Sequence, residues 1–191
     1  TKSLTVTRLS ICIMCPITLL FVLCCLPDVS WMSMVMALPM GFIEEKVSDR
    51  QAVSATFVRS PKTTRPILLL AAKSGRISVL ENPDDSSDAS TILDLRDRIC
   101  HNGERGVQNI VPHPDFDNNR WIYIFYTEHK DRCLEEAGDD TPKNVVARFQ
   151  MNPETLDLDY NDRQVIWRGA PSIKWNHNGG AMDFGNDGML Y

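Results

Sequence analysis

The chain has 191 residues, of which 43% are hydrophobic and 24% are charged, and its formal net charge is −5 at pH 7. This composition is typical of a folded globular protein and excludes a disordered chain, which would carry fewer apolar residues. No basic stripe runs along the sequence, so the charge pattern argues against a nucleic-acid partner. The length is that of one domain of ordinary size.

The first segment of the chain has the layout of a secretory leader. Lys2 and Arg8 precede an apolar run over residues 9–26, and Val35-Met36-Ala37 offers small or modest residues at the −3 and −1 positions of a cleavage site. The run also reaches the roughly 18-residue lower limit of a membrane-spanning helix, so an uncleaved anchor is the alternative. We therefore predict that residues 1–37 are a signal peptide or signal anchor, and that the protein is secreted to the extracellular space or anchored in a membrane.

After the leader, short β-prone runs alternate with clusters of turn residues. The runs are rich in aliphatic and aromatic residues, and Gly, Pro, Asn and Asp bound them. In chain order the predicted strands are 42–47, 52–58, 67–72, 77–80, 107–111, 121–127, 144–150, 164–167 and 180–184. No stretch after residue 40 keeps helical periodicity over three turns, so the sequence predicts an all-β fold.

One unit, a strand followed by a turn and a second strand, recurs at irregular spacing. It covers residues 55–72, 110–127 and 182–191. Repeated units of this kind slightly favour a β-propeller, in which each blade packs against its neighbours. A β-sandwich with ordinary hairpins is the competing interpretation, and the pattern by itself leaves both open.

Aromatic side chains alternate along the strand predicted at residues 121–127. Trp121, Tyr123 and Phe125 are spaced as residues on one face of a strand. Such alternation predicts packing in the core or between blades before it predicts a platform for a sugar ring.

Three long polar insertions separate the strands and are predicted to be surface loops, namely residues 81–90, 128–143 and 152–163. The last insertion holds Asp157, Asp159 and Asp162, which are most simply a solvated turn. No loop supplies a full set of oxygen ligands for calcium, so the sequence predicts no metal site.

Six cysteines are present, and the four at positions 12, 15, 24 and 25 fall in the predicted leader. Cys100 and Cys133 remain, one in the loop before a predicted strand and one in the loop after a strand. In an oxidising compartment such a pair is expected to form one disulfide, and two unpaired thiols are the alternative.

The end of the chain holds a candidate for a chemical role. His177 stands just before Gly179, Gly180 and a predicted strand. Histidine changes charge near neutral pH and can take a proton from a substrate hydroxyl. The glycines remove side-chain bulk, so that a flat ligand can approach the backbone. A histidine that only donates a hydrogen bond to fix the loop is the alternative.

Motifs along residues 38–191 together resemble a known family. Each motif is short, and they follow one another as Leu38-Pro39-x-Gly41-Phe42, Ala72-Lys73-Ser74-Gly75-Arg76-Ile77, Gly103-Glu104-Arg105-Gly106, His113-Pro114-Asp115-Phe116, the strand at 123–127, His177-Asn178-Gly179-Gly180 and Phe184-Gly185-x-Asp187-Gly188-x-Leu190-Tyr191. In this order and spacing they resemble the glucose/sorbosone dehydrogenase family. That family comprises soluble quinoprotein sugar dehydrogenases and the related hedgehog-interacting-protein-like propellers.

The resemblance implies a six-bladed β-propeller, of which residues 38–191 would be an N-terminal fragment of two to three blades, because a blade takes about 40–50 residues. It also implies oxidation of a sugar hydroxyl with hydride transfer to pyrroloquinoline quinone. The partners would then be a sugar substrate and an electron acceptor. Calcium-binding loops and the basic ligands of the cofactor are expected in later blades, so this fragment alone is expected to be inactive.

The resemblance also implies roles for single residues. His177 falls on the catalytic base, and Glu104 falls on a position that touches the cofactor in family members. Gly179 and Gly180 would keep the wall beside the cofactor open. For Glu104 the alternative is a surface ion pair with a neighbouring arginine, either Arg105 or Arg98.

Three differences from the family pattern argue against redox activity, and two of them, the run at residues 107–110 and Ala181, favour a second function. Residues 107–110 read Val-Gln-Asn-Ile where an apolar run with a second glycine is usual, Pro112 replaces an aromatic residue, and Ala181 stands where catalytic members often carry an arginine. An arginine could pair with carboxylates of the cofactor, and alanine cannot. The alternative is a non-catalytic extracellular β-propeller that binds a protein or carbohydrate partner.

Overall fold

The fold is that of a computed structural model, which describes residues 7–11, 42–83, 89–129, 133, 135, 138 and 141–191. The chain divides into two compact units, of which the smaller is Thr7–Lys46 and the larger includes Val47–Tyr191. The candidate functional residues all belong to the larger unit.

The smaller unit is a two-stranded antiparallel ribbon. β1 (Thr7–Ile11) pairs with β2 (Phe42–Lys46), with Thr7 opposite Lys46 and Ile11 opposite Phe42. Apart from β1, the predicted leader at residues 1–37 lies outside the described residues, and its role stays a prediction. Within the described part of the chain, no helix has the length and apolar character needed to cross a membrane.

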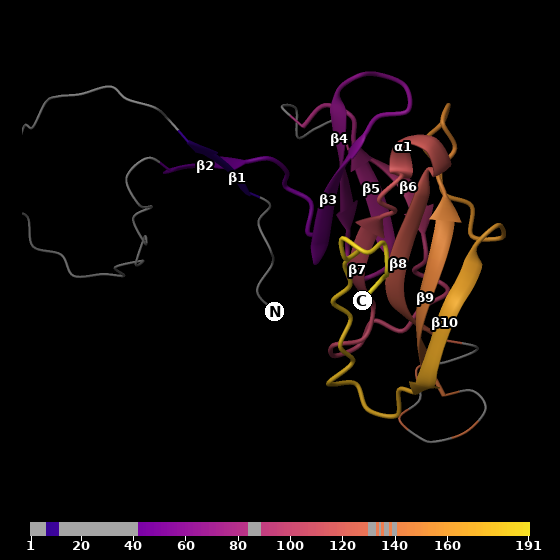
Figure 1. Ribbon diagram of the computed structural model, residues 1–191. Coiled ribbons are helices and arrows are strands. Elements are labelled where there is room, and N and C mark those ends of the chain that lie inside the picture. Colours follow the sequence, from indigo (N-terminus) through magenta and orange to yellow (C-terminus); the bar gives the residue numbers. More distant parts are fainter. Residues whose placement is uncertain are drawn as a thin grey trace, which may run out of the picture. The chain divides into compact units, whose positions relative to one another are not determined.

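The larger unit begins with a four-stranded antiparallel sheet whose strands follow one another in chain order (Figure 1). Its strands are β3 (Ser54–Arg59), β4 (Pro66–Ala71), β5 (Arg76–Leu80) and β6 (Ala89–Asp94). The turn between β4 and β5 depends on Gly75, which has a φ of 109°. A Cβ atom at this position would also lie 3.1 Å from the backbone N of Arg96, so the dihedral angle and the nearby backbone both favour glycine.

A second four-stranded sheet repeats this arrangement. Its strands, again in chain order, are β7 (Val107–Pro112), β8 (Trp121–Glu128), β9 (Lys143–Gln150) and β10 (Gln164–Pro171). The short helix α1 (Phe116–Asn119) lies in the connection between β7 and β8. Two consecutive four-stranded meanders are the arrangement of two neighbouring propeller blades.

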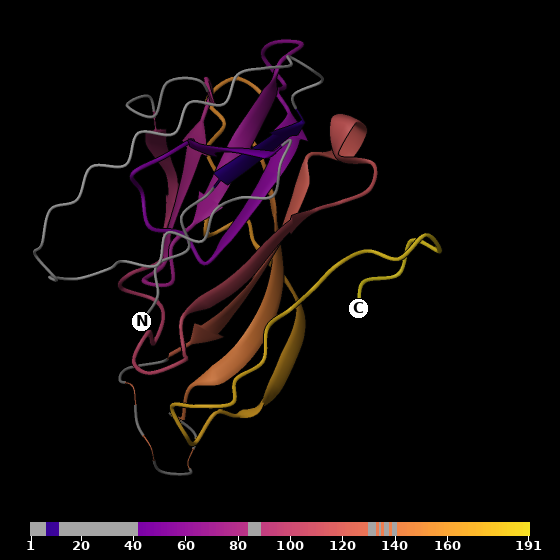
Figure 2. The same cartoon turned by 90° about the vertical axis from the view of Figure 1, so that its left-hand side faces the viewer.

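The main hydrophobic core lies between the two sheets (Figure 2). Alternate residues of β4, β5, β8 and β9 point into it, which is the pattern expected of strands that bury one face against a second sheet. From the first sheet the core includes Ile67, Leu69, Ala71, Ile77 and Val79, and from the second it includes Ile110, Ile122, Ile124, Tyr126, Val145, Ala147 and Phe149. The two blades are therefore held together by apolar packing.

The opposite face of β8 forms a second, smaller cluster. Tyr123 and Phe125 are buried there with Met182, and Trp121 packs at the edge. A hairpin over residues 183–191, closed by paired backbone hydrogen bonds between Asp183 and Tyr191 of 3.1 and 2.9 Å, follows Met182. Phe184 from this hairpin packs edge-on against Tyr123, with ring centroids 5.2 Å apart. The predicted packing role of the alternating aromatic residues is confirmed.

The predicted all-β fold is confirmed, and most predicted strands match observed ones within a few residues. Three predictions were wrong in part. β6 was missed because its first residues, Ala89–Thr91, are small, polar and largely exposed, so they lack the expected alternation. The strand predicted at 180–184 is reduced to an isolated bridge between Phe184 and Leu190. The recurring two-strand unit is also only part of a larger sheet of four strands.

A buried tyrosine in the core gives the protein a specific response to alkaline pH. Burial, reinforced by the charge of Glu128 and partly offset by Arg163, raises the pKa of Tyr126 to about 12. An unfolded chain ionises tyrosine near pH 10, so the stability that Tyr126 contributes is full below pH 10 and is lost as the pH rises towards 12. Two pKa units correspond to about 2–3 kcal/mol.

We expect Tyr126→Phe to remove this loss, because phenylalanine keeps the ring and cannot ionise. The measurement is urea unfolding at several pH values between 8 and 11.5. As the pH rises above 10, the free energy of unfolding should fall more steeply for the wild type than for the variant. Tyr123→Phe, on the opposite face of the same strand, controls for removal of a hydroxyl. Parallel pH profiles for wild type and Tyr126→Phe would contradict the prediction.

Candidate functional site

Two loops meet at one end of the second sheet. This is the end where β7 and β9 begin and β8 and β10 finish, as the pairing of Val107 with Tyr126 and of Lys143 with both Glu128 and Pro171 shows. The first loop is the connection at residues 95–106, and the second, called here the histidine loop, comprises residues 172–181. These loops carry Glu104 and His177.

Hydrogen bonds join the two loops directly. The backbone N–H of Glu104 donates to the carbonyl oxygen of Trp175 at 2.7 Å, and the backbone N–H of His177 donates to Oε2 of Glu104 at 2.5 Å. The structure therefore brings the two predicted site residues together. Glu104 contacts the backbone of His177, so its carboxylate holds the loop that carries the candidate base.

Local backbone geometry explains why glycines flank Glu104. A Cβ atom on Gly103 would lie 2.4 Å from the indole ring of Trp175, and one on Gly106 would lie 2.3 Å from the carbonyl oxygen of Lys73. The same Lys73 oxygen accepts a hydrogen bond of 3.0 Å from the backbone N–H of Val107. The backbone of the loop at residues 95–106 therefore packs closely against two segments, the turn between β4 and β5 and the histidine loop.

His177 itself is exposed and has an unusual backbone conformation. Its φ is 58°, in the left-handed region, which is uncommon for residues other than glycine, although asparagine, aspartate and histidine adopt it more often than the rest. Such conformations persist only where the surroundings enforce them, and they are frequent at functional sites. The bond from the His177 N–H to Glu104 supplies part of that enforcement.

The two glycines after His177 differ in their surroundings. Gly179 has a φ of 66°, and a Cβ atom there would meet no atom within 4 Å. Gly180 has a φ of 119°, and a Cβ atom there would lie 2.3 Å from Cβ of Gln108. Gly179 thus borders open space, whereas Gly180 is needed for close packing of the histidine loop on β7 and does not border an open wall.

The alternative ion pairs of Glu104 are not formed, because both neighbouring arginines have other partners. Arg98 lies over the ring of Tyr160, with 4.7 Å from its guanidinium carbon to the ring centroid. Arg105 is turned inward and is fully buried. Burial lowers the pKa of the Arg105 guanidinium, and the charge of Glu135 opposes this shift. The group remains charged at any ordinary pH because arginine titrates so high.

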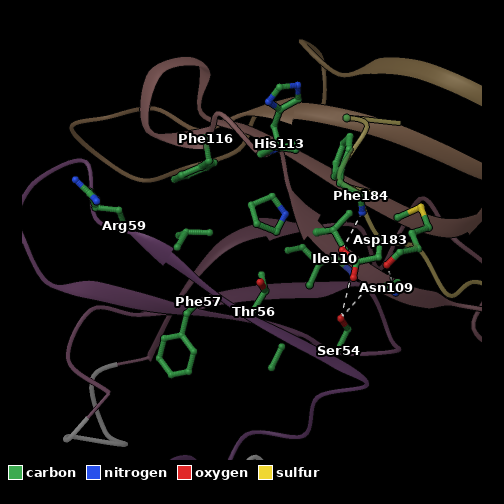
Figure 3. Close-up of a pocket in the computed structure, with 18 of the residues that line it drawn as sticks. Ser54, Thr56, Phe57, Arg59, Asn109, Ile110, His113, Phe116, Asp183 and Phe184 are labelled. Carbon is green, nitrogen blue, oxygen red and sulfur yellow. Dashed lines mark hydrogen bonds between the residues drawn. The ribbon is translucent and has the colours of Figure 1, made fainter. Parts of the chain in front are cut away.

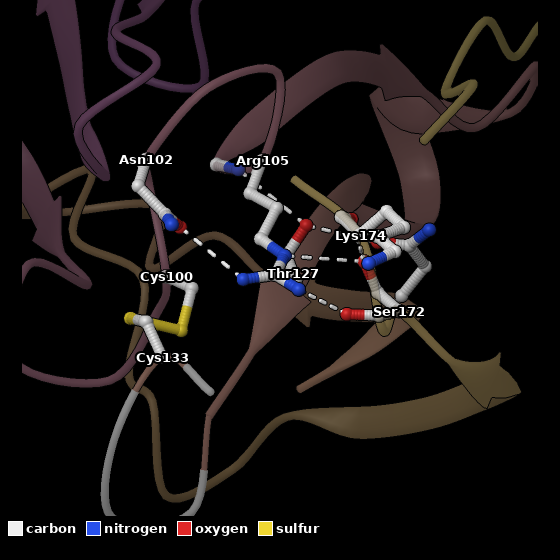
Figure 4. Close-up of a disulfide and its surroundings, with 9 residues drawn as sticks. Cys100, Asn102, Arg105, Thr127, Cys133, Ser172 and Lys174 are labelled. Atoms are coloured by element: carbon white, nitrogen blue, oxygen red, sulfur yellow. Dashed lines mark hydrogen bonds between the residues drawn. A yellow bond between two sulfur atoms is a disulfide. The ribbon is translucent and has the colours of Figure 1, made fainter. Parts of the chain in front are cut away.

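A disulfide anchors the first loop. Cys100 and Cys133 are joined, with their Cα atoms 5.4 Å apart, and the backbone N–H of Cys100 donates to the carbonyl oxygen of Thr127 at 2.9 Å (Figure 4). The bridge links the loop before β7 to the connection after β8. It therefore lies in the same loop as Glu104.

A hollow lies at the other end of β7. It has a volume of about 820 Å³ and is bordered by β3, β7 and the start of the C-terminal hairpin (Figure 3). Ser54 donates to Oδ1 of Asn109 at 3.0 Å, and Asn109 donates to the carbonyl oxygen of Met182 at 3.2 Å. This relay ties the three segments together. Neither Glu104 nor His177 borders the hollow.

Within the described residues, no group of three or more His, Cys, Asp or Glu side chains is placed to hold a metal ion. Asp157, Asp159 and Asp162 border an open hollow beside the connection from β9 to β10. Their charges are spread along this exposed loop, as in a solvated turn.

The sequence analysis missed the buried polar residues that hold the histidine loop in place. Three of them, Ser172, Asn144 and Thr127, are ordinary polar residues outside any motif. They form hydrogen bonds between segments that are far apart in the sequence. Arg105 lies inside a recognised motif, yet its charge favoured a surface position. A glycine on each side, at positions 103 and 106 of the tight loop, was the one available signal.

The fold and the site define a class of protein: β-propeller blades that present a histidine on a loop at one end of the sheets. Residues 61–191 match the family model described as "Glucose / Sorbosone dehydrogenase". The chain belongs to this family.

Curated relatives and solved structures agree with this assignment. The chain is similar to Hedgehog-interacting protein of Homo sapiens, with 27% identity over 156 residues, and to the same protein of Mus musculus, with 26% identity. Each match covers 78% of this chain and 21% of the relative, so the chain spans about a fifth of the length of these relatives.

Among solved structures, a glucose dehydrogenase matches with a TM-score of 0.56 and 22% identity, over 72% of this chain and 35% of that chain. The apo form of the soluble aldose sugar dehydrogenase from Escherichia coli matches with a TM-score of 0.52 and 18% identity, over 69% and 33%. The PQQ-bound aldose sugar dehydrogenase from Streptomyces coelicolor matches with a TM-score of 0.50 and 20% identity, over 71% and 40%. These likenesses show the fold, and the propeller interpretation is confirmed over the sandwich.

Proposed function

We propose that the whole protein is a secreted sugar dehydrogenase of the quinoprotein type, in which His177 acts as the base. The observation that carries the proposal is the arrangement of an exposed His177, held in a left-handed conformation by Glu104, beside the open space at Gly179. The imidazole would accept the proton of a sugar hydroxyl. When bound, pyrroloquinoline quinone would supply the two-electron acceptor for the hydride.

The residues present fit part of such a cofactor site. The missing side chain at Gly179 leaves room for a flat ring system, and His177 is exposed on the same loop. Carboxylates on the cofactor call for cations. Ala181 supplies none, but the Lys73 ammonium donates to the carbonyl oxygen of Gly103, which places a positive charge beside the Glu104 loop. Lys73, Gly179 and Glu104 are therefore the residues of this chain that would border the cofactor.

The test is an activity assay on the full-length protein. The purified protein would be incubated with pyrroloquinoline quinone, calcium and a panel of aldoses, and reduction of an artificial dye would be followed. Dye reduction that depends on both the quinone and the sugar supports the proposal. Absence of quinone-dependent reduction with every sugar would remove the enzymatic function.

A second candidate function is binding of an extracellular protein, and three observations favour it. The curated relatives carry the name Hedgehog-interacting protein, and Ala181 lacks the charge that a cofactor carboxylate would need. The exposed face of the site includes Trp175, a large apolar side chain of the kind enriched at interfaces. Titration of the full-length protein with a Hedgehog protein, with Trp175→Ala and His177→Ala as variants, tests this function. Binding that is lost in the tryptophan variant and kept in the histidine variant would support it.

A further inference from the structure

A fully buried guanidinium lies beneath the two loops of the site. The side chain of Arg105 is 0% exposed. Its Nε donates to Oγ of Ser172 at 3.2 Å, Nη2 donates to the carbonyl oxygen of Ser172, and Nη1 donates to Oδ1 of Asn102 at 3.4 Å (Figure 4). A charged side chain is rarely buried unless its donors are satisfied, and here the fork of the guanidinium grips one residue at two points.

From Ser172 the hydrogen bonds continue into the histidine loop. The Ser172 hydroxyl donates to Oδ1 of Asn178, and Nδ2 of Asn144 donates to Oδ1 and to the carbonyl oxygen of the same Asn178 at 3.3 and 3.2 Å. Oγ1 of Thr127 donates to Oδ1 of Asn144 at 2.9 Å and accepts from the backbone N–H of Gly106 at 3.4 Å. The hydrogen bonds thus lead back to Gly106, the residue that follows Arg105. They form a closed circuit through the loop at residues 95–106, the histidine loop, β9 and β8.

Asn178 is the point at which this circuit reaches the candidate base. It is 8% exposed, whereas its neighbours His177 and Gly179 are exposed and have φ values of 58° and 66°. One inward side chain therefore anchors the loop between two residues that face outward. Buried polar networks restrict the geometry of the groups that they join. In this network Ser172 and Asn144 hold Oδ1 and the carbonyl oxygen of Asn178, while Nδ2 of Asn178 has no hydrogen-bond partner among the described residues.

We propose that Arg105 is a positioning residue for His177, acting through Ser172 and Asn178. The proposal rests on the proposed role of His177 as the base, and it explains why the guanidinium of Arg105 is buried beneath the two loops. Arg105 sets the distance between the Glu104 loop and the histidine loop, so that Glu104 can hold the His177 backbone. Lysine cannot replace it, because a single ammonium lacks the planar fork that contacts both oxygens of Ser172.

The test compares Arg105→Lys with the wild type in the full-length protein by amide hydrogen exchange. We expect the amides of Glu104, His177 and Asn178 to exchange about tenfold faster in the variant, because the local opening of the loop costs less. Exchange at core amides such as Leu69 should stay the same. Arg148→Lys is the matched control, since Arg148 lies near the end of β9 opposite the two loops, where it donates from Nε and Nη2 to one oxygen of Gln164. It should leave the histidine loop unchanged.

Unchanged exchange at the His177 and Asn178 amides would overturn the proposal, as would an equal increase at Leu69, which marks a general loss of stability. Ser172→Ala keeps the carbonyl acceptor and removes only the hydroxyl, so it tests the same link if Arg105→Lys does not fold, with the same outcomes deciding. Where the wild type reduces dye, Arg105→Lys should lower kcat with little change in KM, and an unchanged kcat would count against the proposal. A wild type without activity refutes the dehydrogenase function, and the exchange result still decides whether Arg105 positions the loop.

Discussion

Replacing His177 with asparagine should lower the rate of quinone-dependent sugar oxidation by the full-length protein by about 10²–10⁴-fold. This is the range that a general base typically contributes. Asparagine is the informative replacement because it tolerates the left-handed backbone conformation, with φ of 58°, that His177 adopts. The backbone N–H can therefore continue to donate to Glu104. The loss would then report the missing imidazole and not a collapsed loop.

The measurement is kcat and KM with the best sugar from the activity panel. His101→Asn serves as the control, because His101 is an exposed histidine in the same loop as Glu104. Its rate should stay within about twofold of the wild type, as is usual for a surface substitution away from the reacting groups. Equal rates for wild type and His177→Asn would show that the histidine serves only the loop, which is the structural alternative that the sequence left open.

Removing the disulfide should lower the free energy of unfolding by about 3–4 kcal/mol. The bridge between Cys100 and Cys133 closes a loop with a sequence separation of 33, and in the chain-entropy model a closed loop of this size restricts the unfolded chain by that amount. Cys100 is also buried, so part of the loss comes from packing around the first loop. Denaturant unfolding of Cys100→Ser/Cys133→Ser against the oxidised wild type measures the change.

A reducing agent provides the matched control for this prediction. It should lower the stability of the wild type by a similar amount and leave the double variant unaffected, because the variant has no bridge to break. Two titratable thiols at these positions in the unreduced protein would contradict the pairing. Since the same loop carries Glu104, we also expect local exchange at Glu104 to rise when the bridge is opened.

The sequence was most informative where both faces of a strand are buried. β4 and β8 were predicted within about one residue because Ile67–Ala71 and Ile122–Tyr126 carry dense apolar side chains. It was least informative at the outer edge strands. β10 exposes nearly all of its residues, and β6 begins with three small or polar residues, so neither shows the alternation that pattern reasoning needs.

The candidate site divides in the same way. His177, Glu104 and Gly179 could be singled out because they fall in short motifs with known spacing. Their contact could not be predicted, since 73 residues separate Glu104 from His177 and only the packing of the two loops brings them together. The difference between Gly179 and Gly180 was equally hidden, because it depends on where Gln108 lies.

By itself, the sequence determined the class of fold, the family resemblance, the two cysteines available for pairing and the histidine most suited to proton transfer. These follow from local composition and spacing, which act over a few residues. Only the tertiary structure decided that Arg105 points inward while Glu104 points outward, and that a circuit of polar side chains joins four segments beneath His177. Both outcomes depend on which distant groups can satisfy a buried donor, and a linear pattern does not record that choice.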